Sequence, residues 1–216
     1  MGLKVNEIFH SIQGESTHAG WPCVFVRLAG CNLRCSYCDT RYAYEQGELF
    51  EIPAIVRRVR EYGRGLVELT GGEPLLQEKT PDLVASLLSE GFTVLVETNG
   101  SLDIGLVDPR CARIVDIKCP SSGMADRNEL RNLEKLTRRD EIKFIIGCRE
   151  DYEFAVKILG FHQETLTGAG CAINFSPIFG SLSPRTLAEW ILEDRLRVRL
   201  NLQLHKLIWD PETRGV

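Results

Sequence analysis

Residues 24–40 read VFVRLAGCNLRCSYCDT, and they decide the fold because a short apolar strand runs directly into a loop with three cysteines. The strand is expected over residues 24–28. The loop contains Cys31, Cys35 and Cys38, with three residues between the first two cysteines and two residues between the last two. In folds built from βα units, the functional loops leave the carboxyl ends of the strands. We therefore expect a site at this end of the sheet.

The rest of the chain alternates apolar strands with segments of helical period, which is typical of a parallel sheet covered by helices. Strands are expected at residues 24–28, 66–70, 94–98, 114–118, 142–146 and 173–176, with a late one near 198–202. Helices are expected at residues 53–62, 81–90, 129–136, 152–159 and 184–193. A full eight-strand barrel commonly needs about 250 residues, and this chain has 216. The predicted fold class is therefore α/β, an incomplete TIM-like βα barrel of about six parallel strands.

Composition narrows the class of protein. No repeat, charge block or low-complexity linker divides the sequence, which predicts one domain over residues 1–216. A net charge of −4 gives no general attraction to nucleic acid. The sequence has no basic stretch followed by an apolar run at its start and no apolar run of about 18 residues. We therefore expect a cytoplasmic protein that binds neither nucleic acid nor membrane.

An incomplete barrel has open sheet edges, which loops, termini or a second subunit must cover. A homodimer is the expected assembly. The tail at residues 203–216 either covers the site or forms an interface, and the sequence does not choose between the two.

Eight cysteines in a chain without a secretion signal predict reduced thiols. A loop with three thiolates can hold a 4Fe-4S cluster and leave the fourth iron open to a chelating ligand. The alternative is structural zinc, which needs four ligands, and no fourth Cys or His stands at finger-like spacing beside the triplet. The isolated cysteines are expected in the core; they are Cys23, Cys111, Cys119, Cys148 and Cys171.

The Cys-x3-Cys-x2-Cys spacing resembles the signature of the radical S-adenosylmethionine (SAM) superfamily, whose cluster cleaves SAM to a 5'-deoxyadenosyl radical. Residues 71–74, GGEP, follow an expected strand and resemble the loop that holds the methionine amino group in that superfamily. The resemblance implies a radical SAM core with a 4Fe-4S cluster on Cys31, Cys35 and Cys38. It also implies a set of SAM-binding residues, namely Tyr37, Cys38, Asp39, Gly72, Asp116, Ile117 and Lys118.

Residues 9–15, FHSIQGE, are polar, are expected to precede the first strand, and resemble the FxSxQGE signature of 7-carboxy-7-deazaguanine synthases. Further matches to that family are spread over nearly the whole chain, at Arg27, Asp39-Thr40, TGGEP, residues 121–124 and residues 203–206. The resemblance implies a lyase that converts 6-carboxy-5,6,7,8-tetrahydropterin into 7-carboxy-7-deazaguanine with loss of ammonia, in queuosine biosynthesis. It implies Mg²⁺ on Thr40, an external electron donor, and SAM that is regenerated in each cycle.

The chemistry of a pterin explains several of these residue types. Its aminopyrimidinone edge is rich in donors that a carboxylate or amide accepts, and its carboxylate suits a guanidinium. The expected substrate-binding residues are Ile12, Gln13, Gly14, Glu15, Arg27 and Thr70.

Two alternatives remain open at this stage. A glycyl-radical-enzyme activase would share the cysteine loop and GGEP but act on a partner protein, and the Gln13-Gly14-Glu15 motif argues against it. A zinc or redox-sensing module without enzymatic activity is the second alternative.

Overall fold

The computed structural model describes residues 2–63 and 65–216. Its strands form an open nine-stranded sheet in the order β3-β1-β2-β4-β5-β6-β7-β8-β9. The strands are β1 (Leu3–Ile12), β2 (Pro22–Leu28), β3 (Glu48–Phe50), β4 (Leu66–Gly71), β5 (Thr93–Thr98), β6 (Ala112–Ile117), β7 (Glu141–Ile146), β8 (Ala172–Pro177) and β9 (Arg199–Leu200). From β2 to β9 the neighbouring strands are parallel, whereas β1 pairs antiparallel with both β2 and β3. The predicted parallel α/β sheet is confirmed.

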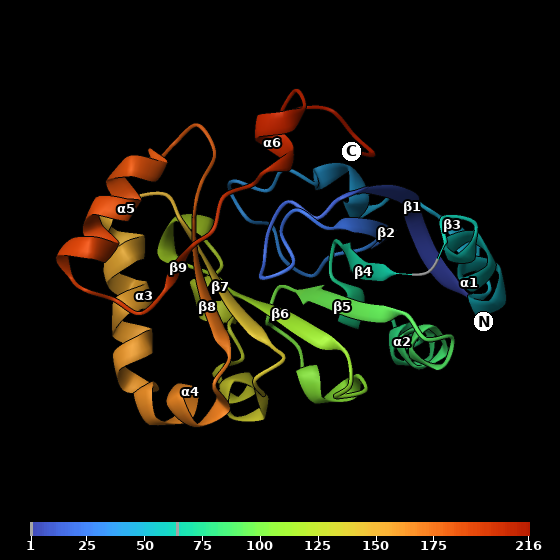
Figure 1. Ribbon diagram of the computed structural model, residues 1–216, viewed down its shortest axis with the longest axis horizontal. Coiled ribbons are helices and arrows are strands. Elements are labelled where there is room, and N and C mark those ends of the chain that lie inside the picture. The colour runs from blue at the N-terminus through green and yellow to red at the C-terminus, as the bar shows by residue number, and fades with distance from the viewer. Residues whose placement is uncertain (1, 64) are drawn as a thin grey trace.

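The helices cover one face of the sheet, from α1 and α2 at one end to α3, α4 and α5 at the other, while α6 lies apart near the C-terminus (Figure 1). They are α1 (Ile52–Arg60), α2 (Thr80–Ser89), α3 (Arg149–Phe161), α4 (Gln163–Ala169), α5 (Pro184–Glu193) and α6 (His205–Ile208). Short 3₁₀ helices occupy connections, namely η1 (Arg41–Tyr44), η2 (Pro74–Leu76), η3 (Ile104–Leu106), η4 (Pro120–Ser122), η5 (Ala125–Arg127) and η6 (Leu130–Lys135). Among the described residues, no helix has the length and apolar character that crossing a bilayer requires.

Side chains alternate between the two faces of the strands. Toward the helices, which we call the outer face, residues such as Val67, Val96 and Phe144 join the main apolar core. On the opposite, inner face, a small apolar cluster around Phe25 and Leu95 forms a floor. Beyond this floor, the inner positions near the carboxyl ends of the strands are polar, and they surround the site described below.

Two expectations for the secondary structure and one for the burial of the isolated cysteines were wrong. Residues 9–12 belong to β1 and do not precede the first strand. Residues 129–136 form the 3₁₀ helix η6 and not an α-helix, because the amide of Asn132 is buried and bonded to the backbone of Gly100, Leu102 and Ile104. Of the isolated cysteines, Cys148 is exposed and Cys171 is partly buried, whereas the other three lie in the core.

Candidate active site

A cavity of about 730 Å³ opens on the inner face of the sheet, at the carboxyl ends of the parallel strands. It brings together nearly all the residues that the sequence predicted for the site, which are Ile12, Gln13, Gly14, Glu15, Arg27, Cys31, Cys35, Tyr37, Cys38, Asp39, Thr40, Thr70, Gly72, Asp116 and Lys118. Ile117 is the exception. Its side chain is fully buried in the outer-face core, so only its backbone is available near the cavity.

The cysteine loop is held by the turn that follows β6. Ser36, between Cys35 and Tyr37, donates from its backbone N–H to the carbonyl of Ser122 (3.1 Å) and from its hydroxyl to the carbonyl of Ser121 (2.6 Å). Ser121 is fixed in turn by the buried carboxylate of Asp151, which accepts from the Ser121 backbone N–H at 2.8 Å and from the Ser121 hydroxyl. The loop therefore depends on residues far along the chain.

The three thiols of this loop line the cavity and form no disulfide. Burial raises the pKa of the Cys31 and Cys35 thiols, and a positively charged metal centre bound to them would favour their thiolate forms. Nowhere in residues 2–63 and 65–216 do three His, Cys, Asp or Glu side chains converge as ligands of a single metal ion. In a cubane cluster each cysteine binds a different iron.

Two glycines bring the GGEP loop against the cysteine loop. A Cβ on Gly72 would lie 2.0 Å from the carbonyl oxygen of Gly30, and Gly71 has a positive φ of 138°. The Gly72 N–H donates to Leu28 O at 3.0 Å, and the N–H of Glu73 donates to Gly30 O at 2.7 Å. Glycine is required here because the two backbones are in direct contact.

Two buried polar atoms at the cavity have no hydrogen-bond partner within the described part of the chain: the Tyr37 hydroxyl and Oδ1 of Asp116. Lys118 Nζ donates to the other oxygen of Asp116 at 2.6 Å. Burial raises the pKa of Tyr37, which keeps its hydroxyl protonated. Because buried polar groups are nearly always bonded, these two atoms fit a ligand with its own donors and acceptors, as the ribose and adenine of SAM provide.

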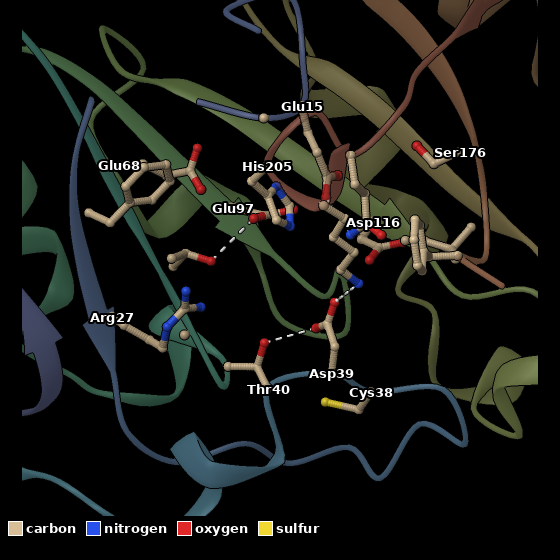
Figure 2. Close-up of a pocket in the computed structure, with 18 of the residues that line it drawn as sticks. Glu15, Arg27, Cys38, Asp39, Thr40, Glu68, Glu97, Asp116, Ser176 and His205 are labelled. Atoms are coloured by element: carbon tan, nitrogen blue, oxygen red, sulfur yellow. Dashed lines mark hydrogen bonds and ion pairs between the residues drawn. The ribbon is translucent and has the colours of Figure 1, made fainter. Parts of the chain in front are cut away.

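A charged cluster lies beside Asp116, because Lys143 on β7 is the register partner of Asp116 on β6. Lys143 Nζ contacts Glu15 Oε2 at 2.9 Å and also Glu97, while the Thr70 hydroxyl donates to Glu97 at 3.2 Å. Figure 2 shows Glu15 and Glu97 converging from different elements on this space. Burial alone would raise the pKa of Glu97, but the charge of Lys143 lowers it to about 2.

The side-chain amide of Gln13 connects this charged cluster to a further carboxyl group, that of Glu68. Its Nε2 donates to Glu68, and its Oε1 accepts from the backbone N–H of Glu15 at 3.0 Å. Burial, assisted by the negative charge of Glu97, raises the pKa of Glu68.

Arg27 lies on β2, beside Thr70 of β4. Glu7 accepts from its Nε at 2.7 Å, and its guanidinium lies 5.7 and 5.8 Å from the rings of Phe9 and Tyr42. Figure 2 shows the end of the guanidinium pointing into the cavity. The Arg27 guanidinium is thus bonded to Glu7 through Nε and faces the cavity with its other end, where it can pair with a carboxylate.

The tail covers the cavity, which was one of the two possibilities left open by the sequence. Residues 203, 205, 206 and 211–216 line it, and α6 lies on the side of the sheet away from α1–α5 (Figure 1). Gln203 Nε2 donates to Glu15 Oε1 at 2.8 Å, and Lys206 Nζ contacts Asp39 Oδ2 at 2.7 Å. The tail thus connects the QGE motif to the cysteine loop.

Sequence reasoning missed several charged or titratable residues of the cavity, among them Glu68, Glu97, Lys143 and His205. Glu68, Glu97 and Lys143 share a signal that can be read in the sequence. Each is a charged residue inside a strand that is otherwise mostly apolar. His205 lies in the tail, within the family match at residues 203–206, but its place in the cavity was not predicted.

Comparisons with known proteins agree with this geometry. Residues 26–119 match the Radical SAM superfamily. The chain is 49% identical to the 7-carboxy-7-deazaguanine synthase of Chlorobaculum tepidum, over 99% of this chain and 97% of that protein. The chain belongs to the 7-carboxy-7-deazaguanine synthase family. It is therefore a radical SAM enzyme, and neither the activase nor the zinc module is favoured.

Other members of the 7-carboxy-7-deazaguanine synthase family support the same assignment. The relative from Koribacter versatilis is 43% identical over 99% of this chain and 100% of its own length. The crystal structure of QueE from Escherichia coli superposes with a TM-score of 0.76, covering 94% of both chains at 25% identity. The open α/β sheet is thus the fold of a solved relative.

Proposed function

We propose that this chain converts 6-carboxy-5,6,7,8-tetrahydropterin into 7-carboxy-7-deazaguanine with release of ammonia. One observation carries the proposal: a single cavity of about 730 Å³ contains both the cysteine loop and the Gln13-Gly14-Glu15 motif. When bound, the cluster and SAM supply the one-electron cleavage that starts the removal of hydrogen from carbon 6 of the pterin. The protein binds and orients the substrate and excludes water from the reaction.

The substrate is proposed to lie between the charged cluster and Arg27. The carboxylate of Glu15 and the amide of Gln13 face the aminopyrimidinone edge, with Ile12 and Gly14 shaping the same wall. Arg27 pairs with the substrate carboxylate, and the Thr70 hydroxyl contacts the ring. Lys143 Nζ holds the Glu15 carboxylate in place through their 2.9 Å contact.

SAM is proposed to lie on the other side of the cavity, against Gly72. Cys31, Cys35 and Cys38 would ligate the cluster. The adenosyl group would satisfy the Tyr37 hydroxyl and Asp116 Oδ1, which lack partners among the residues that the structure describes. Lys118, the backbone of Ile117, and residues Cys38 and Asp39 complete the SAM set.

Mg²⁺ is proposed beside Thr40, whose hydroxyl lines the cavity and lies 2.9 Å from Asp39 Oδ1. Since Mg²⁺ keeps several waters, few protein ligands are needed. Chelation with EDTA should abolish turnover while leaving the iron content unchanged. Full activity without Mg²⁺ would reject the site.

The remaining parts of the proposal concern the setting of the enzyme. The reaction needs an external one-electron donor, and the eight free cysteines suit a reducing cytoplasm. We propose that residues 1–216 act as one domain. A homodimer would cover β1, since Trp21, just before β2, is 67% exposed near that edge of the sheet. Light scattering on the purified protein measures the assembly.

The decisive assay is anaerobic. Reconstituted protein is incubated with reductant, Mg²⁺, excess 6-carboxytetrahydropterin and substoichiometric SAM, and the deazapurine is quantified by mass spectrometry. Product should exceed the SAM added, because the proposed cycle regenerates SAM. Cys35→Ala should abolish the product and iron loading, whereas Glu15→Gln should lower turnover at unchanged iron content. An intact cluster that yields no deazapurine would refute the proposal.

A further inference from the structure

The amide of Asn99, at the carboxyl end of β5, is held in one orientation beside the cysteine loop. Its Oδ1 accepts two hydrogen bonds from Ser101, one from the backbone N–H at 3.0 Å and one from the hydroxyl at 2.6 Å. With the oxygen fixed in this way, the NH₂ group must point in the opposite direction. It donates to Asn32 Oδ1 at 3.0 Å and lies 3.8 Å from Cys31 Sγ.

The backbone of Asn99 is fixed as firmly as its side chain. Its N–H donates to Glu73 Oε2 at 2.6 Å, and the same fully buried carboxylate accepts from Thr98 Oγ1 at 2.8 Å and from Leu75 N at 2.9 Å. Asn99 itself is 8% exposed. The GGEP loop, the end of β5 and the cysteine loop therefore hold the Asn99 amide against the Cys31 sulfur.

We propose that Asn99 is a positioning residue that sets the reduction potential of the cluster by directing its N–H dipole at the sulfur of Cys31. This inference rests on the proposed function, which places the cluster on that thiolate. One-electron reduction adds negative charge to the cluster and its cysteine sulfurs, and a nearby N–H donor stabilises that charge. Asn99 thereby makes the cluster easier to reduce.

Cys31 has a second donor, the backbone N–H of Leu33 at 3.4 Å. A side-chain substitution leaves that bond in place, so Asn99 is the donor that mutagenesis can isolate. Asn99→Asp keeps the shape and the acceptor for Ser101 but replaces the NH₂ donor with a carboxylate oxygen, which also adds a negative charge, so the neutral Asn99→Ala is measured beside it. Asn99→Ala removes the whole amide. Ser101→Ala is the matched control, because it removes the hydroxyl bond from the same loop but keeps the Ser101 backbone N–H that fixes the Asn99 oxygen and so keeps the Asn99 donor in place.

The experiment is a potentiometric titration of the reconstituted full chain, reduced with dithionite through mediators and followed by the EPR signal of the reduced cluster, without SAM. Both Asn99 variants should have a more negative midpoint than the wild type. The expected fall in the reduced-to-oxidised ratio at a fixed potential is about tenfold, or about 59 mV for a one-electron couple. Ser101→Ala should titrate close to the wild type.

Three outcomes separate this inference from the proposed function. Equal midpoints for the wild type and Asn99→Asp, at equal iron content, overturn the role of Asn99. An equal shift in Ser101→Ala and the Asn99 variants also overturns it, because the effect would then belong to the loop. A wild type that takes up no cluster refutes the proposed function instead. Should Asn99→Ala fail to fold, the isosteric Asn99→Asp decides.

Discussion

Replacing Lys143 with methionine should destabilise the protein by about 3 kcal/mol at pH 8. Methionine conserves the volume of the side chain but leaves Glu15 and Glu97 without their shared cation. Removing one partner of a buried ion pair typically costs about 3–5 kcal/mol. The Lys143 side chain is 5% exposed, whereas that of Glu97 is 26% exposed to the cavity, so the lower end of this range applies.

The loss should depend on pH in a defined direction. In the wild type, Lys143 holds the pKa of Glu97 at about 2 against the opposing effect of burial, below the ordinary value of 4.5. This stabilisation is present above pH 4.5 and is lost as the pH falls toward 2. In Lys143→Met, the hydrogen bond from Thr70 still opposes burial, but the charge of Lys143 is gone, so the pKa of Glu97 rises. The cost of burying the Glu97 charge without its cation exists only above this raised pKa. The difference in the free energy of unfolding between wild type and Lys143→Met should therefore shrink as the pH falls from 8 toward 5.

Urea unfolding of the reduced apoprotein, followed by circular dichroism, measures the effect. The double variant Lys143→Met/Glu97→Gln should regain about 1–2 kcal/mol of the loss, because it removes one of the unpaired charges. Lys79→Met, at an exposed ion pair with Asp82, is the control and should change little. A Lys143→Met protein as stable as the wild type at pH 8, or a deficit of the same size at pH 5.5, would refute the reasoning.

Three further changes test other parts of the site. Asp151→Asn should cost about 1–3 kcal/mol in urea unfolding, because the buried carboxylate holds Ser121 through two donors; no loss would show that the turn is held otherwise. Gly72→Ala should lower the melting temperature, since its Cβ would meet Gly30 O, whereas the open Gly168→Ala should not; equal melting temperatures would contradict the close contact. Lys206→Met should speed proteolysis within residues 203–216, measured by mass spectrometry, because it breaks the 2.7 Å contact with Asp39; unchanged cleavage would show that this ion pair does not hold the tail.

The parallel strands β2 and β4 to β8 were predictable because each is a short, largely apolar run that is mostly buried on both faces, whereas the two residues of β9 are exposed. β1 was not predicted, because it alternates apolar with polar residues such as Lys4, Asn6 and His10, and the polar side suggested a lead segment. The 3₁₀ geometry of η6 depends on tertiary bonds of the Asn132 amide to residues 100–104, about 30 positions earlier, which no local pattern reveals.

The site shows the same division between local and distant information. Motifs contiguous in sequence, such as the cysteine triplet and residues 13–15, were found because their spacing carries the signal. Lys143 was not found, because its importance arises from Glu15, 128 residues away. A charged residue inside a buried strand is the clue that would have located it, since such a residue needs a partner.

The hydrogen bonds from Ser36 to Ser121 and Ser122 have a consequence for biosynthesis. Ser36 precedes Ser121 by 85 residues, and ribosomes add about 5–20 residues per second. The three thiols are thus synthesised roughly 4–17 s before the turn that steadies their loop. Iron inserted before that turn exists would meet an unsupported peptide, so correct metallation belongs after residues 121 and 122 have been synthesised.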